Sequence, residues 1–96
     1  MHERYLDWDA SVPTPRESGC DYLVPLSGDG DAIWEDEWAR AILASRLGWK
    51  KRGWQMYEVT LKPSDLRIER VPDEHLAAVR ADLNHSVAQC NAVPRA

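Results

Sequence analysis

The sequence contains no apolar run that approaches the roughly 20 residues needed to cross a bilayer. Its first residues, Met1 to Arg4, also lack the apolar stretch of a secretory signal peptide. These two absences argue against a membrane protein and against secretion. We therefore expect a protein that works in the cytoplasm without membrane contact.

Cysteine is scarce as well, because the chain has only Cys20 and Cys90, which lie 70 positions apart. A chain that is 44% hydrophobic can build a core without a disulfide, and cytoplasmic thiols stay reduced. We interpret both cysteines as free, packed thiols, with a disulfide between them as the alternative.

The motifs that would indicate a metal site or an active site are missing. There is no Cys-x-x-Cys and no His-x-x-x-His in the chain. His85 and Cys90 are five residues apart, which on a helix is about 140° of rotation and so places them on different faces. No sequence feature sets a Cys or Ser beside a base. We expect no metal, no cofactor and no catalytic residues, and a hydrolase or metal enzyme is the least favoured of three hypotheses.

The loop from Gly28 to Asp31 could bind either a cation or an anion. Asp29 and Asp31, with Glu35 nearby, provide the carboxylates that calcium prefers, but only the opening of a full calcium loop is present. The same carboxylates would repel a phosphate, and the Gly-x-x-x-x-Gly-Lys spacing is absent. We prefer a turn in which Asp31 caps the helix that follows.

What the sequence does contain is tryptophan: five in 96 residues, with no phenylalanine. The length is that of one domain with a small core. A charged fraction of 29% is typical of a soluble globular protein, and the net charge of −4 argues against a nucleic-acid backbone as the main partner. Each indole could be a core residue or a recognition anchor, so its placement decides the functional prediction.

The N-terminal part shows little regular pattern. Residues 1–19 contain Pro13 and Pro15 and have neither helical nor strand periodicity, so we predict an irregular arm. The arm includes Trp8 and is apolar enough for part of it to lie on the domain. Residues 20–26 have the aromatic and β-branched content of a short edge strand.

The clearest element is a helix over residues 32–47. Its buried face is predicted to contain Trp34, Trp38, Ala41, Ile42 and Ser45, widened by Ile33, Leu43 and Leu47. Asp31 suits the N-cap, and Gly48 suits the left-handed position after the last turn. Acidic residues crowd the first half and basic residues follow the end, so the helix carries an acidic-to-basic gradient.

The C-terminal half contains three further predicted elements. Residues 53–61 alternate like a strand, and residues 66–71 form a second, weaker strand of the same hairpin. Residues 72–91 form a second amphipathic helix that starts with a proline, and residues 92–96 form a flexible tail.

Together these elements predict an α+β fold with a short antiparallel sheet of about three strands and two amphipathic helices. The order is β-α-β-β-α after the irregular arm, and residues 20–91 form the single domain.

The tract from Trp49 to Trp54 combines three consecutive cations, Lys50, Lys51 and Arg52, with an indole at each end. Cations beside stacking rings favour contact with a nucleic acid, although the acidic first half of the preceding helix would make it a poor recognition helix. The simplest interpretation is a solvated turn that complements the end of the helix. The third interpretation is a turn that binds an acidic protein surface.

Five indoles exceed what a core of this size can hold, so one or two should stay partly exposed. Trp34 and Trp38 belong to the predicted core face, which leaves Trp8 on the arm and Trp49 and Trp54 at the basic turn. Exposed tryptophan beside charge is typical of an interface centre. We therefore predict a small module that binds a protein partner through these three indoles and the cations of the turn. A homodimer through exposed indoles is a variant of this hypothesis, and a nucleic-acid-binding regulator using the same turn is the alternative.

The chain is rich in Ala, Arg, Asp, Val and Trp and poor in Lys, Asn and Ile. In this composition it resembles the small accessory proteins encoded by phages of high-GC actinobacteria. The resemblance covers the whole chain loosely and carries no site residues. It implies a protein made in an infected bacterial cell, where an adaptor or inhibitor of this kind binds and modulates a host protein in the host cytoplasm.

Overall fold

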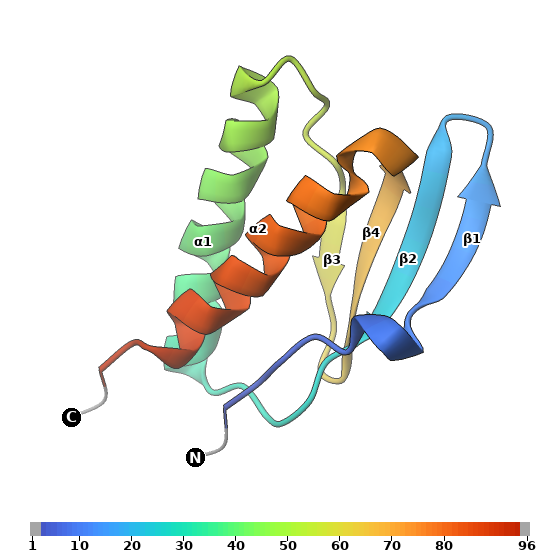
Figure 1. The fold of residues 1–96 in the computed structure, drawn as a ribbon. Coiled ribbons are helices and arrows are strands. Elements are labelled where there is room, and N and C mark those ends of the chain that lie inside the picture. The colour runs from blue at the N-terminus through green and yellow to red at the C-terminus, as the bar shows by residue number, and fades with distance from the viewer. Residues whose placement is uncertain (1–2, 95–96) are drawn as a thin grey trace.

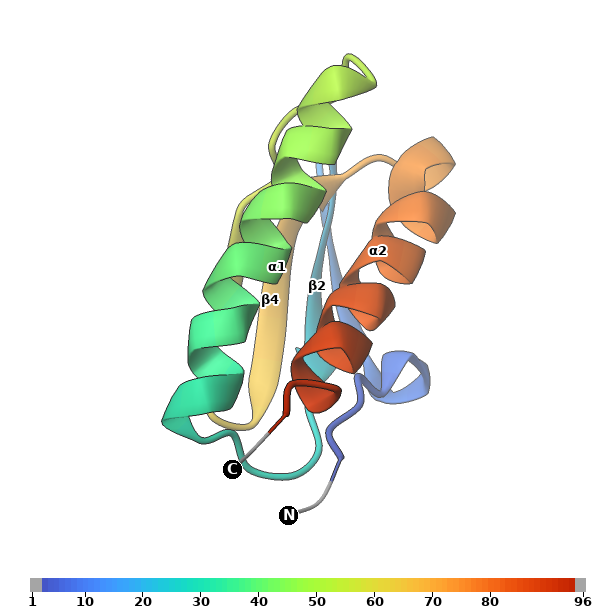
Figure 2. The ribbon, with the colours of Figure 1, turned by 90° about the vertical axis from the view of Figure 1, so that its left-hand side faces the viewer.

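A computed structural model gives the fold of the protein and describes residues 3–94. Within these residues, the elements in chain order are η1 (Trp8–Ala10, a 3-10 turn), β1 (Val12–Arg16), β2 (Gly19–Pro25), α1 (Ala32–Lys51), β3 (Val59–Leu61), β4 (Asp65–Val71) and α2 (Asp73–Asn91). The strands form one antiparallel sheet in the order β1-β2-β4-β3, and both helices cover the same face of it (Figure 1 and Figure 2). The predicted α+β class and the order of its elements are confirmed, with one extra strand at the start.

The core lies between the sheet and the two helices. Val24 of β2 and Leu66 and Ile68 of β4 have no exposed surface and alternate with residues on the other face. The helices contribute Trp34, Trp38, Ala41 and Trp49 from α1 and Val79, Leu83, Val87 and Cys90 from α2. The opposite face of the sheet carries no helix and bears Leu23 and Arg67 as cross-strand partners.

Helix α1 starts where the sequence predicts but ends later. At its start, the backbone N–H of Trp34 donates to the carboxylate of Asp31 at 2.8 Å, which confirms the predicted N-cap. The helix then runs past Gly48, which was expected to follow the last turn, and ends at Lys51. The first half of the tract predicted as a basic turn, Trp49 to Lys51, therefore belongs to the last turn of α1.

Helix α1 is terminated by Gly53, which lies five positions after Gly48. Gly53 has a φ of 81°, the left-handed region that glycine adopts without steric cost. The backbone N–H groups of Gly53 and Trp54 donate to the carbonyls of Lys50 and Trp49, both at 3.0 Å. This is the Schellman pattern, which satisfies carbonyls that the end of the helix leaves unpaired.

The irregular arm predicted over residues 1–19 contains a strand. Residues Val12–Arg16 form β1, which pairs with β2 along its whole length and places Pro13 opposite Tyr22 and Pro15 opposite Cys20. Proline obscured this strand in the sequence, but at an edge every second N–H faces solvent, so proline there removes no ladder hydrogen bond. As a result β2, which was predicted to be an edge strand, lies inside the sheet between β1 and β4.

The segment before β1 also lies on the domain. Leu6 forms an isolated antiparallel bridge with Leu26. The Trp8 ring is buried, and its Nε1–H donates to the Asn84 side-chain oxygen at 2.8 Å. The arm therefore supplies part of the core.

Arg4 and Asn91 join the two ends of the described chain. The backbone N–H of Arg4 donates to the Asn91 side-chain oxygen at 3.2 Å, and the Asn91 amide donates to the Arg4 carbonyl at 2.8 Å. The Asn91 oxygen also accepts the indole N–H of Trp34 at 3.0 Å. The guanidinium of Arg4 donates to the carbonyls of Ser27 and Pro63 and lies 4.5 Å from the centroid of the Trp34 ring.

The remaining elements differ from their predicted bounds at the ends. The strand expected over residues 53–61 is confined to Val59–Leu61, because Arg46 of α1 donates to the carbonyls of Met56 and Tyr57 at 3.3 and 3.1 Å and holds the preceding segment against the helix. Pro72 is the N-cap of α2 rather than its first helical residue. In the described part of the chain, neither helix is long and apolar enough to span a membrane.

The buried carboxylate of Asp21 in β2 links this strand to β1 and β4. Asp21 is 4% exposed, and it accepts hydrogen bonds from Arg16 at 2.9 Å, from Arg67 at 3.3 Å and from the backbone N–H of Arg70 at 2.9 Å. Arg70 has a φ of 59°, at the irregularity in the pairing of β2 with β4. Burial alone would raise the pKa of Asp21, but the three hydrogen bonds outweigh it and lower the pKa.

Candidate binding surface on helix α1

The structure separates the five tryptophans into core residues and one contact residue. Trp34 and Trp38 are 1% and 7% exposed and stack with ring centroids 5.8 Å apart, which confirms their predicted place in the core. Trp49 has no exposed surface, and its indole N–H donates to the Asp82 carboxylate at 2.7 Å. Trp8 is 8% exposed. Trp8 and Trp49, which the sequence offered as contact residues, are therefore core residues, and among the five tryptophans Trp54 alone is half-buried rather than buried.

Trp54 lies between the end of α1 and the start of α2, held by two neighbours. Its ring stacks on the imidazole of His75 with centroids 3.8 Å apart, and the guanidinium carbon of Arg52 lies 5.0 Å from the ring centroid. His75 Nδ1 is 2.6 Å from the hydroxyl oxygen of Tyr57. Burial, with a smaller contribution from Glu74, raises the pKa of Tyr57, so its hydroxyl is protonated at neutral pH and can donate to the imidazole. The half-buried indole is thus ordered before any partner arrives.

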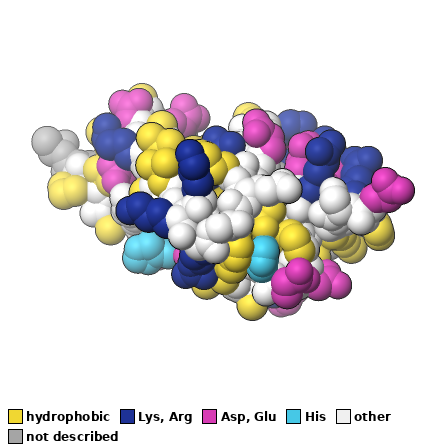
Figure 3. All heavy atoms as spheres, turned by 90° about the horizontal axis from the view of Figure 1, so that it is seen from above, with side chains coloured by type: hydrophobic (Ala, Val, Ile, Leu, Met, Phe, Trp, Pro, Cys, Tyr) yellow, Lys and Arg dark blue, Asp and Glu magenta, His cyan; other side chains and the backbone are white. Residues whose placement is uncertain are grey.

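The cations of the tract are exposed. Lys50 and Lys51 occupy the last turn of α1, and Arg52 follows it. Within residues 3–94 neither lysine forms an ion pair. Figure 3 looks down on this end of the molecule and shows Lys and Arg side chains around the end of α1, with Asp and Glu side chains near the start of α2. The positive charge complements the carbonyl end of the helix.

Helix α1 has a second apolar face that the sequence analysis assigned to the core. Ile33, Leu43 and Leu47, expected to widen the buried face, are 45%, 51% and 44% exposed. At 100° per residue, Leu47 lies about 180° around the helix from Trp38, and this angle is the sequence signal that could have placed it outside. An amphipathic helix of a monomer has one apolar face, so a second one needs an explanation.

These leucines form part of a continuous strip. Leu43 and Leu47 are one turn apart, with Arg40 before them and Lys50 and Lys51 after them, and we call these five residues the outer strip of α1. Four of them, Arg40 to Lys50, fall within an arc of about 80° on the helix. All five residues of the strip are exposed, so the strip is open to a partner along its length.

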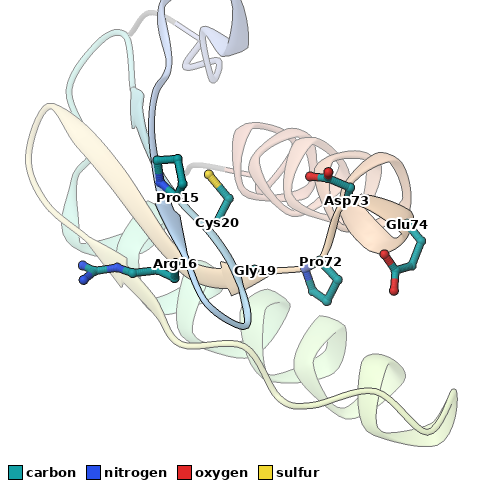
Figure 4. Close-up of a pocket in the computed structure, with 7 residues that line it drawn as sticks. All are labelled: Pro15, Arg16, Gly19, Cys20, Pro72, Asp73 and Glu74. Carbon is teal, nitrogen blue, oxygen red and sulfur yellow. The ribbon is translucent and has the colours of Figure 1, made fainter.

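The hollows elsewhere on the described surface are less suited to a ligand. One of about 460 Å³ lies between the β1–β2 turn and the start of α2. Figure 4 shows Cys20 near its centre, Arg16 directed away from the cysteine, and Asp73 and Glu74 on the helix side. Because Arg16 is engaged with Asp21 and two carboxylates stand at the start of the helix, this hollow offers no free cation to an anionic ligand.

A second hollow, of about 300 Å³, follows the groove between α1 and α2. Three of its polar side chains already have partners: the hydroxyl oxygens of Ser45 and Ser86 are 3.0 Å apart, and the carboxylate of Asp82 accepts the N–H of Trp49. Both cysteines are free thiols, and burial raises the pKa of Cys90 to about 11. In the part of the chain that the structure describes, no three His, Cys, Asp or Glu side chains gather to hold a metal ion.

Comparison of the chain with protein-family models, with curated proteins and with solved structures finds no match.

Proposed function

We propose that this protein is a small protein-binding module that contacts its partner through the outer strip of α1 and the adjoining Arg52 and Trp54. Its role is that of an adaptor or inhibitor, because the surface recognises another protein and the chain supplies no reactive groups beside it. The compositional resemblance to accessory proteins of actinobacterial phages directs the search for the partner to bacterial host proteins.

The observation that carries the proposal is the exposure of Leu43 and Leu47 on the side of α1 opposite the tryptophan core. Exposed aliphatic side chains that lie together and are bordered by charge are typical of an interface centre with a polar rim. Arg52 and Trp54 follow the strip closely in the chain, on the side of α1 toward α2, and tryptophan and arginine are enriched among residues that dominate binding energy.

The nucleic-acid alternative uses the same cations but fits the structure less well. A base would need a free indole face, and the Trp54 ring is already stacked on His75 with Arg52 also over it. Trp49, the other indole of the tract, is buried. The leucines of the strip would have no counterpart on a phosphate backbone.

The proposal is tested by proximity labelling in the producing cell. The wild type is compared with a Leu43→Glu, Leu47→Glu variant, which places charge on the strip, and with Val12→Glu, which changes an equally exposed aliphatic residue on β1. We expect the wild type and Val12→Glu to enrich the same partner protein. With the strip variant, the enrichment of that protein should fall about tenfold. Circular dichroism must show that all three are folded.

Two results would contradict the proposal. One is a set of labelled proteins that does not differ between the wild type and the strip variant. The other is binding to duplex DNA that falls steeply with salt and is lost in Lys50→Glu, Lys51→Glu, because that result assigns the cations to a nucleic acid.

A further inference from the structure

The outer strip of α1 has a pattern that selects the chemistry of its partner. Along the helix the order is cation, leucine, leucine, cation: Arg40, Leu43, Leu47, then Lys50 with Lys51. The leucines are half-exposed, and the side chain of Arg40 is 71% exposed. A partner must therefore cover two aliphatic side chains and supply negative charge at both ends of the contact.

The spacing of the strip favours a helix as the occupant. Arg40, Leu43, Leu47 and Lys50 follow one another at intervals of three, four and three residues, the repeat by which one helix packs lengthwise against another. A strand would instead need an open sheet edge. A helix presents apolar residues three and four apart on one side and can place acidic residues one turn to either side of them.

A second copy of this chain does not satisfy the same requirement. If two α1 helices pack antiparallel with Leu43 of each against Leu47 of the other, Lys50 of each copy comes opposite Arg40 of the other. If they pack parallel and in register, each lysine faces its own counterpart. Both arrangements set like charges across a small apolar contact, which disfavours self-association on this face.

We propose that the partner presents an acidic amphipathic helix to the outer strip of α1, with two apolar residues one turn apart and a carboxylate near each end of the contact. This inference rests on the proposed function and adds the chemical class of the partner. The two lysines form no ion pair within residues 3–94. Arg40, whose side chain is 71% exposed, is paired only with the neighbouring Glu37, at 3.2 Å, so its remaining N–H groups can still donate to an incoming carboxylate.

Three fluorescein-labelled helical peptides of equal length test this chemistry. The first carries two leucines one turn apart, flanked by glutamates. The second keeps the leucines and replaces the flanking glutamates with lysines, and the third keeps the glutamates and replaces the leucines with alanines. Fluorescence anisotropy against the purified full chain should show that the first peptide binds about tenfold tighter than either control and that added salt weakens it.

Protein variants show where the peptide binds. Leu43→Ser with Leu47→Ser should weaken the first peptide about tenfold, whereas Val12→Ser should leave its affinity unchanged. The Lys50→Ala, Lys51→Ala variant should weaken binding of the first peptide by less than the leucine variant does, and the remaining binding should depend less on salt. All five positions are exposed, so the variants are expected to fold.

The acidic-helix inference is overturned if the lysine-flanked peptide binds as well as the glutamate-flanked one, or if the leucine variants bind the first peptide normally. It is also overturned if sedimentation shows a dimer of the 11.0 kDa chain that the leucine variants abolish. If these peptide tests fail while labelling in the cell still depends on Leu43 and Leu47, the proposed function stands and only the partner chemistry is wrong. If both fail, the strip is not a binding surface.

Discussion

At the scale of single residues, Trp49 and Trp54 stand at either end of the same tract but should respond differently to truncation. Trp49→Ala leaves a cavity and removes the N–H that donates a hydrogen bond to the Asp82 carboxylate. We therefore expect it to lower the free energy of unfolding by about 3–5 kcal/mol. Trp54→Ala removes a stacking contact at the surface, for which we expect about 1 kcal/mol. Urea unfolding at 25 °C measures both, and equal losses would contradict the assignment of Trp49 to the core.

Asp21 should make the sheet sensitive to acid. Its pKa is lower in the folded than in the unfolded protein, so its stabilising effect is present at neutral pH and is lost as the pH falls through the folded-state value. We expect Asp21→Asn to reduce the free energy of unfolding by about 1–2 kcal/mol at pH 7 and by less at pH 3, which is below the ordinary pKa of aspartate in the unfolded chain, so that ionisation of Asp21 favours the folded state less. The matched control is Glu17→Gln, which removes an exposed carboxylate from the neighbouring turn. A deficit that is the same at both pH values would count against the ionised form as the stabilising species.

At the scale of elements, the prolines of β1 protect the edge of the sheet. Val12, Thr14 and Arg16 supply the N–H groups that face β2, so Pro13 and Pro15 occupy the positions whose N–H would point outward. Another strand therefore finds no donors at these two positions. We expect Pro13→Val with Pro15→Val to keep the fold but to increase self-association with concentration, measured by size-exclusion chromatography and light scattering. A variant that stays as monodisperse as the wild type would show that the prolines do not guard this edge.

The same prolines explain what sequence patterns could and could not predict about the elements. Both helices and the hairpin of β3 and β4 follow from periodicity, whereas β2 follows from its aromatic and β-branched content. The strand Val12–Arg16 has no buried residue and two prolines, so neither periodicity nor propensity marks it. The end of α1 was misplaced because Gly48 and Gly53 are equally good terminators in sequence, and only the tertiary contact of Trp49 with Asp82 favours the longer helix.

Only part of the candidate surface could be predicted from the sequence. The cations Lys50, Lys51 and Arg52 are exposed as expected, because charge at the end of a helix stays in solvent. The two indoles beside them could not be assigned from the sequence, since burial of Trp49 depends on α2, which lies more than 20 residues away in the chain. The exposure of Leu47 has a signal in the sequence, since Leu47 lies about 180° around the helix from Trp38, but the width of the buried face depends on how α1 packs against the sheet and α2.

At the scale of the whole molecule, Asn91 holds the N-terminal segment, α1 and α2 together. Its side chain accepts from the Arg4 backbone and the Trp34 indole and donates to the Arg4 carbonyl. We expect Asn91→Ala to lower the free energy of unfolding by about 2–4 kcal/mol, because three partly buried groups lose their partners. Gln89→Ala, which removes only an exposed hydrogen bond to Glu37, is the control. Thermal unfolding of both variants makes the comparison, and similar melting temperatures would show that Asn91 is not a structural centre.

The position of α2 in the chain also has a consequence for synthesis on the ribosome. Among the described elements α2 comes last, and it covers Trp34, Trp38 and Trp49 together with α1 and the sheet. Because translation runs from the N-terminus, α1 and the strands emerge from the exit tunnel before α2 does. The tryptophan face of α1 therefore stays partly uncovered on the nascent chain until α2 has emerged as well.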